Sequence, residues 1–189
     1  MPKRLDASYH ERMLTSRMED PEFSMEYTRA RREIEQVDFV QPPIAPPPAG
    51  DSREQREAEP VMVAERSAEL GVVLAPREIR LSDGSCVKVD GASEDLSVLC
   101  EAWAHQGPPK SAQRNKVIVD AFKLSHVARS LGTSPRLILL FSDGAACAPF
   151  TRSGWAAGAL RTHGIELKVV PLPDDVRQRV VAAQARQFR

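Results

Sequence analysis

The sequence predicts an α/β domain in its C-terminal part, and three observations support this. Residues 86–90 and 97–104 are two short segments typical of strands, and a turn or loop borders each of them. Residues 136–142, RLILLFS, form a continuous apolar run, as expected for a strand covered on both faces. Between these strands, residues 108–131 have helical periodicity and end at a glycine. Together they indicate a sheet with helices packed on it.

The order of the elements predicts the arrangement of that sheet. The expected elements are a helix at 61–70, strands at 78–81, 86–90 and 97–104, a helix at 108–131, a strand at 136–142, a helix at 154–163, a strand at 165–172 and a helix at 174–187. This αβββαβ order, followed by αβ, predicts a mixed sheet with helices on both faces. No G-x-G-x-x-G or Walker loop follows any strand, and LFSDGAACAP holds only a single glycine turn, which disfavours a nucleotide-binding domain.

Residues 1–39 are expected to form a helical N-terminal extension. Asp20 and Pro21 suit an N-cap and a first helical turn. Apolar residues follow at spacings of four, three, four and three, as in an a/d seam, at Phe23, Tyr27, Ala30, Ile34 and Val37. A helix this short is marginal alone, so we expect it to dock on the main domain, on a second copy in a homodimer, or on a protein partner.

Residues 40–60 are predicted to be a proline-rich linker. Their first half, VQPPIAPPPAG, should adopt polyproline II, and the charged second half should be a tether. The alternative, a ligand for a proline-recognition domain, is disfavoured against a stiff spacer. The domain expected from the pattern of strands and helices then covers residues 61–189.

Composition excludes several classes of protein. No apolar run approaches the roughly 20 residues of a spanning helix, and the N-terminus lacks the apolar region of a secretory signal, so we expect no membrane association and a cytoplasmic location. The three cysteines show no C-x-x-C spacing, which argues against a zinc site. Residues 1–59 carry 9 Lys and Arg against 13 Asp and Glu, whereas residues 60–189 carry 17 against 13. The basic excess permits nucleic-acid contact without requiring it.

Four polar residues lie where a metal-dependent nuclease places its site. Asp90 ends one predicted strand and Glu101 lies within the next, while Lys110 and Gln113 occupy the first turn of the long helix. An acid between Cys100 and Ala102 on an apolar strand costs several kcal/mol if it is buried without a partner. Glu101 therefore requires a metal, a basic partner or solvent.

The domain resembles the PD-(D/E)xK nuclease superfamily, the fold of many restriction enzymes, over about 110 residues. Asp90 in VKVDG fits the family's aspartate, and Glu101 in VLCEAWA fits its second acid. The lysine that should follow two positions later is replaced by Trp103, which marks a divergent member. The resemblance implies a restriction-endonuclease-like αβββαβ core and nucleic acid, with DNA favoured, as the partner. LTSRMEDPEFSMEYTRARREIEQVD also resembles the helical segment beside the helix-turn-helix of some bacterial antitoxins, but it includes no recognition helix.

In this superfamily the lysine sometimes moves to the following helix. Lys110 and Gln113 share a stripe with Val117, Ala121 and Leu124, which must face the sheet, so Lys110 is the expected replacement. Lys116 is the second choice, expected on the opposite side. Asp120 and Lys123 form a D-x-x-K sequence that we interpret as a decoy, flanking a buried face of Val117, Ile118, Ala121, Phe122, Leu124 and Ser125. A strand in place of this helix is a disfavoured alternative.

The chemistry implied is phosphodiester hydrolysis. Asp90 and Glu101 would hold Mg²⁺ or Mn²⁺, Lys110 would orient the attacking water or neutralise developing charge, and Gln113 would position the water. Glu65 or Glu69 on the first helix could supply a third acid.

Simpler interpretations remain open for each of these residues. Asp90 precedes a glycine and could be a turn residue. Glu101 could form a structural ion pair with Lys88 or Lys110, and Trp103 and Trp155 are interpreted as core. Two functions follow: a metal-dependent nuclease, favoured by the pair of acids, or a catalytically inactive nuclease-fold domain that binds protein or nucleic acid, favoured by Trp103.

Overall fold

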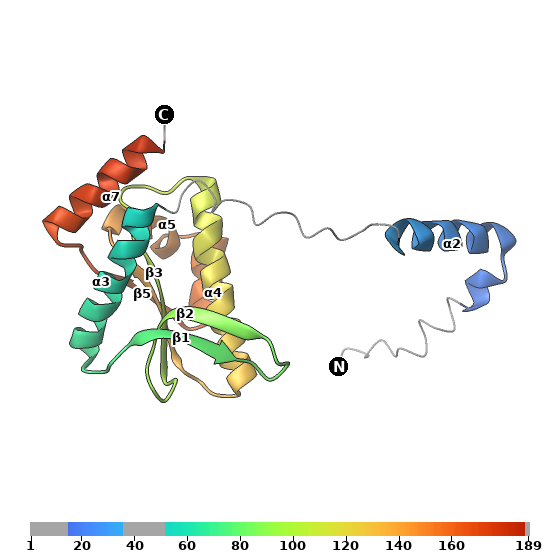
Figure 1. Ribbon diagram of the computed structural model, residues 1–189, viewed down its shortest axis with the longest axis horizontal. Coiled ribbons are helices and arrows are strands. Elements are labelled where there is room, and N and C mark those ends of the chain that lie inside the picture. The colour runs from blue at the N-terminus through green and yellow to red at the C-terminus, as the bar shows by residue number, and fades with distance from the viewer. Residues whose placement is uncertain (1–14, 36–51, 188–189) are drawn as a thin grey trace. The chain divides into compact units, whose positions relative to one another are not determined.

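The computed structural model describes residues 15–35 and 52–187 (Figure 1). The chain divides into two compact units, Met1–Pro46 and Pro47–Arg189. Residues 40–51 of the predicted linker lie outside the described residues. None of the helices in the described ranges combines the length and the hydrophobicity that crossing a membrane requires.

The first unit contains helix α2, Pro21–Glu35. Asp20 precedes it as predicted, and its Oδ1 accepts a hydrogen bond of 3.0 Å from the backbone N–H of Glu22. The rings of Phe23 and Tyr27 stack with centroids 6.0 Å apart, so these two seam positions share one side of the helix. Val37 and the side chains of Ala30 and Ile34 lie outside the described residues. Association through this helix, with a second copy or with a protein partner, stays a prediction.

The second unit is built on one five-stranded mixed sheet, as predicted. Its strands are β1 (Ala75–Arg80), β2 (Cys86–Ala92), β3 (Val98–Trp103), β4 (Arg136–Phe141) and β5 (Ile165–Val169), in the order β1-β2-β3-β4-β5. The pairs β1–β2 and β2–β3 are antiparallel, whereas β3–β4 and β4–β5 are parallel. The helices are α3 (Arg53–Leu70), α4 (Ser111–Leu131), α5 (Gly144–Thr151), α6 (Trp155–Thr162) and α7 (Asp174–Arg186). The predicted αβββαβ order is confirmed.

Helix α3 begins at Arg53, within the predicted linker, rather than at Val61. Its start is a capping box: the Ser52 hydroxyl accepts from the Gln55 N–H at 3.2 Å, and the Gln55 Oε1 accepts from the Ser52 N–H at 2.9 Å. The prediction of a tether over residues 53–60 was therefore wrong. Pro60 lies inside the helix. Because proline disfavours a helix interior, it concealed the helical tendency of a segment that is otherwise rich in good helix formers.

Helix α5 occupies Gly144–Thr151, where the sequence indicated only a glycine turn. Small residues and the internal Pro149 gave this segment no helical apolar stripe, so periodicity could not reveal it. Asp143 is its N-cap residue, and the Asp143 Oδ2 accepts a hydrogen bond of 2.6 Å from the backbone N–H of Gly107. This bond ties the start of α5 to the chain that leaves β3.

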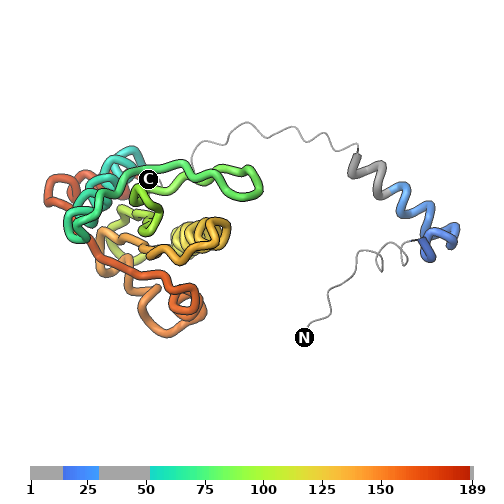
Figure 2. The backbone as a smooth tube through the Cα atoms, turned by 90° about the horizontal axis from the view of Figure 1, so that it is seen from below, coloured from blue at the N-terminus to red at the C-terminus, as the bar shows by residue number. Residues whose placement is uncertain are grey.

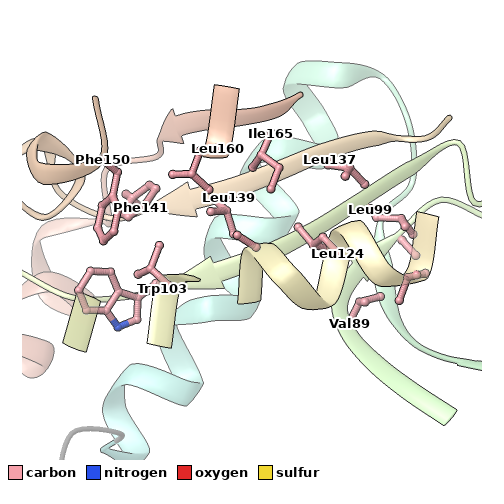
Figure 3. Packing of buried hydrophobic residues seen from close by; sticks show 14 of the residues in the cluster. Val89, Leu99, Trp103, Leu124, Leu137, Leu139, Phe141, Phe150, Leu160 and Ile165 are labelled. Atoms are coloured by element: carbon pink, nitrogen blue, oxygen red, sulfur yellow. The ribbon is translucent and has the colours of Figure 1, made fainter. Parts of the chain in front are cut away.

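The sheet has a hydrophobic core on each face. Helices α3 and α7 cover one face and α4 the other (Figure 1), and α5 and α6 contribute to the same core as α4. Alternation along β3 divides its side chains between the two cores: Leu99 and Trp103 lie on the α4 face, and Val98, Cys100 and Ala102 lie on the α3 face. Figure 3 shows Leu124 of α4 among Leu99 and Leu139 of the sheet. Glu101 therefore belongs to the face that α4 covers.

Gly91 on β2 permits a close approach between β2, β3 and α3. A Cβ at this position would lie 2.5 Å from the Cys100 Sγ and 2.9 Å from the Val63 Cγ1. We expect Gly91→Ala to lower the free energy of unfolding by about 1–3 kcal/mol through overpacking. Denaturant unfolding would measure the loss. The double variant Gly91→Ala/Cys100→Ala should recover part of it, and equal stability of wild type and Gly91→Ala would contradict this account.

Candidate active site

The candidate site lies where β2 and β3 separate. The two strands are in register only at Gly91 with Cys100 and at Ala92 with Leu99. Beyond that point, a side chain makes the contact between the two strands: the Asp90 Oδ2 accepts a hydrogen bond of 3.0 Å from the backbone N–H of Ala102. Asp90 is thus held against β3 by a specific contact, beside the position of Glu101.

Glu101 is a buried acid in the middle of the sheet. Its side chain is 3% exposed, and one oxygen, Oε2, lies 2.7 Å from the Nζ of Lys123 on α4. The other oxygen, Oε1, is buried without a hydrogen-bond partner. Burial raises the pKa of Glu101 to about 8; the charge of Asp90 adds to this increase, and Lys123 opposes it. Proximity to Asp90 and an unsatisfied oxygen make Glu101 a strong acceptor for a cation or a proton.

Helix α4 contributes an acid and two lysines to the same cluster. The Asp120 carboxylate lies 3.0 Å from the Nζ of Lys116 and 3.8 Å from the Nζ of Lys123. Burial lowers the pKa of Lys116, but the carboxylates of Asp120, Glu59 and Asp90 outweigh burial and hold that pKa above its ordinary value. The cluster therefore alternates acids and ammonium groups from β2, β3 and α4.

Glu59 on α3 also belongs to the surroundings of this cluster. It is half-buried, and its charge acts on Lys116. Glu59 was not among the predicted site residues, because residues 40–60 were predicted to be a linker. The signal that could have found it is the Ser52 to Gln55 capping box, which starts α3 early enough to include Glu59.

The site residues predicted from the sequence lie in different parts of the structure. Asp90 and Glu101 come together, since the charge of Asp90 acts on the pKa of Glu101. Lys110 is the N-cap residue of α4, with an exposed side chain, and its backbone N–H donates to the Gln113 Oε1 at 2.8 Å. Gln113 therefore serves the start of the helix. Glu65 is exposed on α3, which packs on the face of the sheet opposite Glu101.

Asp120 and Lys123 lie in a helix as predicted, but Lys123 contacts Glu101, which the interpretation of this pair as a decoy did not anticipate. The predicted stripe of Val117, Ala121 and Leu124 is buried against the sheet. The residues beside the stripe differ from the prediction, however. Asp120 is buried, at 9% exposed, whereas Phe122, which was predicted to be buried, is 73% exposed. The physical reason is a rotation of α4 about its axis, which the apolar stripe alone leaves undetermined within about one residue position. The rotation brings Lys123 to Glu101, in the place predicted for Lys110 or Lys88.

Trp103 and its neighbours fill the space beyond Glu101 on the same face of β3. Trp103 is 5% exposed, so its predicted assignment to the core is confirmed. Its ring stacks on His105 with centroids 4.6 Å apart and meets Phe141 edge-on. His105 is 3% exposed, and burial lowers its pKa. Trp103 is therefore a packing residue of the core on this face.

The two acids offer oxygen ligands for a metal ion. Asp90 and Glu101 supply two carboxylates, and the Glu101 Oε1 has no partner. Mg²⁺ is commonly held by one or two carboxylates and several waters. Within the two described ranges, no set of three or more His, Cys, Asp or Glu side chains is arranged to hold a metal. The two carboxylates are within the number of protein ligands that Mg²⁺ commonly uses.

Comparisons with known proteins yield one distant structural similarity. No protein-family model matches the sequence, and no curated protein is significantly similar to it. A similar solved structure is the crystal structure of a repair endonuclease from Pyrococcus abyssi, with 16% sequence identity and a TM-score of 0.37. The match covers 65% of this chain and 50% of that one, so this chain spans half the length of the endonuclease.

Proposed function

We propose that this protein hydrolyses phosphodiester bonds of nucleic acid, with DNA as the favoured substrate, in a metal-dependent reaction. The observation that carries the proposal is Glu101, a buried acid with one unpartnered oxygen that lies beside Asp90 and is paired with Lys123. Two acids on adjacent strands and a lysine paired with one of them are the residue types of a PD-(D/E)xK site. In this proposal the lysine of that site is on α4 and not on β3.

Each residue has a role that follows from its position. Asp90 and Glu101 would hold Mg²⁺ or Mn²⁺ through the oxygens that hydrogen bonds leave available. A metal bound there would supply charge neutralisation at the phosphate and a lowered pKa for a bound water. Lys123 would donate a hydrogen bond to the attacking water or to the phosphate, because its ammonium already lies at Glu101. Asp120 and Lys116 would orient Lys123 through their own ion pair.

A second function, a nuclease-fold domain that binds without cleavage, is favoured by one observation. The 2.7 Å contact between Glu101 and Lys123 already gives the buried acid a cation, so a metal is not required to compensate it. Trp103 in the position of the usual lysine favours the same function. The two proposals differ in a measurable property, the binding of Mg²⁺ at Glu101.

Calorimetry and plasmid cleavage together test the proposed function. The wild type is expected to bind Mg²⁺ and to nick supercoiled plasmid, and chelation by EDTA should abolish nicking. Asp90→Asn and Glu101→Gln should weaken metal binding and lower the cleavage rate by at least about a hundredfold. Glu65→Gln is the matched control, because Glu65 is exposed on α3, and it should behave like wild type. A wild type that neither binds Mg²⁺ nor nicks DNA would refute the proposal and support the binding module.

A further inference from the structure

A groove with apolar walls runs between α4 and α6, on the opposite side of α4 from the acid cluster. One part, of about 100 Å³, is lined by Ile118, Ala121, Phe122, Ser125, Ala159, Leu160 and His163. A second part, of about 320 Å³, continues from Ser125 and His163 to Arg129. In Figure 2, α4 (yellow) separates the orange segment that contains α5 and α6 from the β1–β2 hairpin. The groove is therefore distinct from the cluster around Glu101.

Two exposed aromatic side chains lie on the two helices that form this groove. Phe122 on α4 lines it and is 73% exposed. Trp155 begins α6 one turn before Ala159, so it shares the side of α6 that meets the groove, and it is 75% exposed. The predicted assignment of Trp155 to the core was wrong. Exposed aromatic rings on neighbouring helices form a surface on which flat, apolar rings can stack.

The charges around the groove favour an anionic ligand. Residues 144–165 contain Arg152 and Arg161 and no Asp or Glu. Within the described residues, neither Arg129, which lines the groove, nor Arg152, which precedes Trp155, forms an ion pair. On the opposite face of the sheet, arginines of α3 and α7 are paired with carboxylates: Arg53 with Glu57, Arg66 with Glu69, Arg177 with Asp174, Arg179 with Asp175 and Arg186 with Glu54. The groove side thus retains positive charge that the other face has neutralised.

We propose that this groove binds single-stranded DNA, with bases stacked on Trp155 and Phe122 and phosphates contacted by Arg129 and Arg152. Aromatic platforms beside unpaired arginines are the combination that single strands require, since stacking accepts any base and the arginines follow the backbone. A duplex keeps its bases stacked on one another and cannot offer them to these rings. In the part of the groove that Phe122 lines, the walls are mostly apolar, with Ser125 and His163 as the polar groups, so this part offers few partners for the 2′-hydroxyl of RNA.

Trp155 itself provides the signal for the experiment. The chain has two tryptophans, and Trp103 is 5% exposed, so quenching of tryptophan emission on binding reports Trp155. The full-length protein would be titrated in EDTA with oligothymidylate, with the matching duplex and with oligouridylate. We expect oligothymidylate to quench the emission and to bind at least about tenfold more tightly than the duplex or the RNA, with an affinity that falls as salt rises.

Substitutions locate the binding to the groove. Trp155→Ala and Phe122→Ala should each weaken oligothymidylate binding by roughly 5- to 150-fold, the range of one lost base stack. Trp155→Phe should retain most of the affinity and lose the quenching. Val181→Ala, an exposed aliphatic position on α7 on the opposite face, is the control and should bind like wild type. Thermal unfolding would show that each variant is folded.

Several outcomes would overturn this inference. Equal affinity for the duplex or for oligouridylate, or unchanged binding in both Trp155→Ala and Phe122→Ala, would do so. Competition by polyglutamate at equal concentration would indicate an acidic protein partner. A wild-type dimer in sedimentation that Trp155→Ala dissociates would indicate a second copy of the chain. Because EDTA removes any metal-dependent cleavage, a protein that binds oligothymidylate but never nicks DNA would refute the proposed function and leave this inference standing.

Discussion

Replacing Lys123 by methionine is expected to lower the rate of plasmid cleavage by roughly a hundredfold or more, because it removes a positioned donor from the reacting phosphate or water. The Lys123 Nζ lies 2.7 Å from Glu101. Methionine keeps much of the length of the side chain and removes its charge. The expected loss is in the cleavage step, so Mg²⁺ affinity should stay equal or rise when a neighbouring cation is removed. Glu101→Gln, by contrast, should lose both metal binding and cleavage.

Lys110→Met is the matched control for this experiment. Lys110 is the exposed N-cap residue of α4, so its replacement should leave cleavage close to the wild-type rate. Cleavage rates at saturating Mg²⁺ and calorimetric metal affinities for the two variants provide the comparison. If Lys110→Met lost cleavage and Lys123→Met retained it, the assignment from the sequence would be correct and the assignment to Lys123 would fall.

Glu101→Gln is expected to stabilise the protein at alkaline pH in the absence of metal. The folded protein keeps the Glu101 proton up to a pKa of about 8, whereas the ordinary value is 4.5. Between these values the folded state binds more protons than the unfolded state, so the free energy of unfolding of the wild type falls as pH rises. At about 1.4 kcal/mol for each pH unit, this difference has an upper bound of about 5 kcal/mol. Glutamine is uncharged at every pH, so the free energy of unfolding of Glu101→Gln does not fall for this reason.

The measurement is denaturant unfolding of the wild type and Glu101→Gln across this pH range, with and without Mg²⁺. The difference in stability between the two proteins should grow with pH and level off above about pH 8. Mg²⁺ should stabilise the wild type at alkaline pH, by about 2.7 kcal/mol when its concentration is a hundred times the dissociation constant, and leave the variant unchanged. Parallel pH profiles would mean that Lys123 keeps Glu101 ionised throughout, which favours the binding module.

The site shows where local patterns stop being informative. Glu101 could be found because it interrupts an apolar strand, where burying a charge is costly. Asp90 could be found because it ends the preceding predicted strand. Lys123 could not be found in this way. The helical stripe of α4 defines the direction that faces the sheet, but lysines on either flank of the stripe satisfy the same pattern. Which of these lysines reaches Glu101 depends on how α4 packs across β2 and β3.

The start of α3 was missed for a different reason. Pro60 and a run of charged residues match the composition of a linker, although the Ser52 capping box and good helix formers were present in the sequence. The error also hid Glu59. Composition is a weaker indicator of a helix start than a specific capping interaction.

The sequence by itself determined the αβββαβ order of the core and the presence of two acids on consecutive strands, but not helix α5. Periodicity and turn residues are local properties, and they are legible before the chain folds. The tertiary structure decided which lysine reaches Glu101, and it also decided that Trp155 and Phe122 are exposed beside a groove. These depend on the rotation and contact of whole helices, because the environment of a side chain is set by neighbours that are distant in the chain.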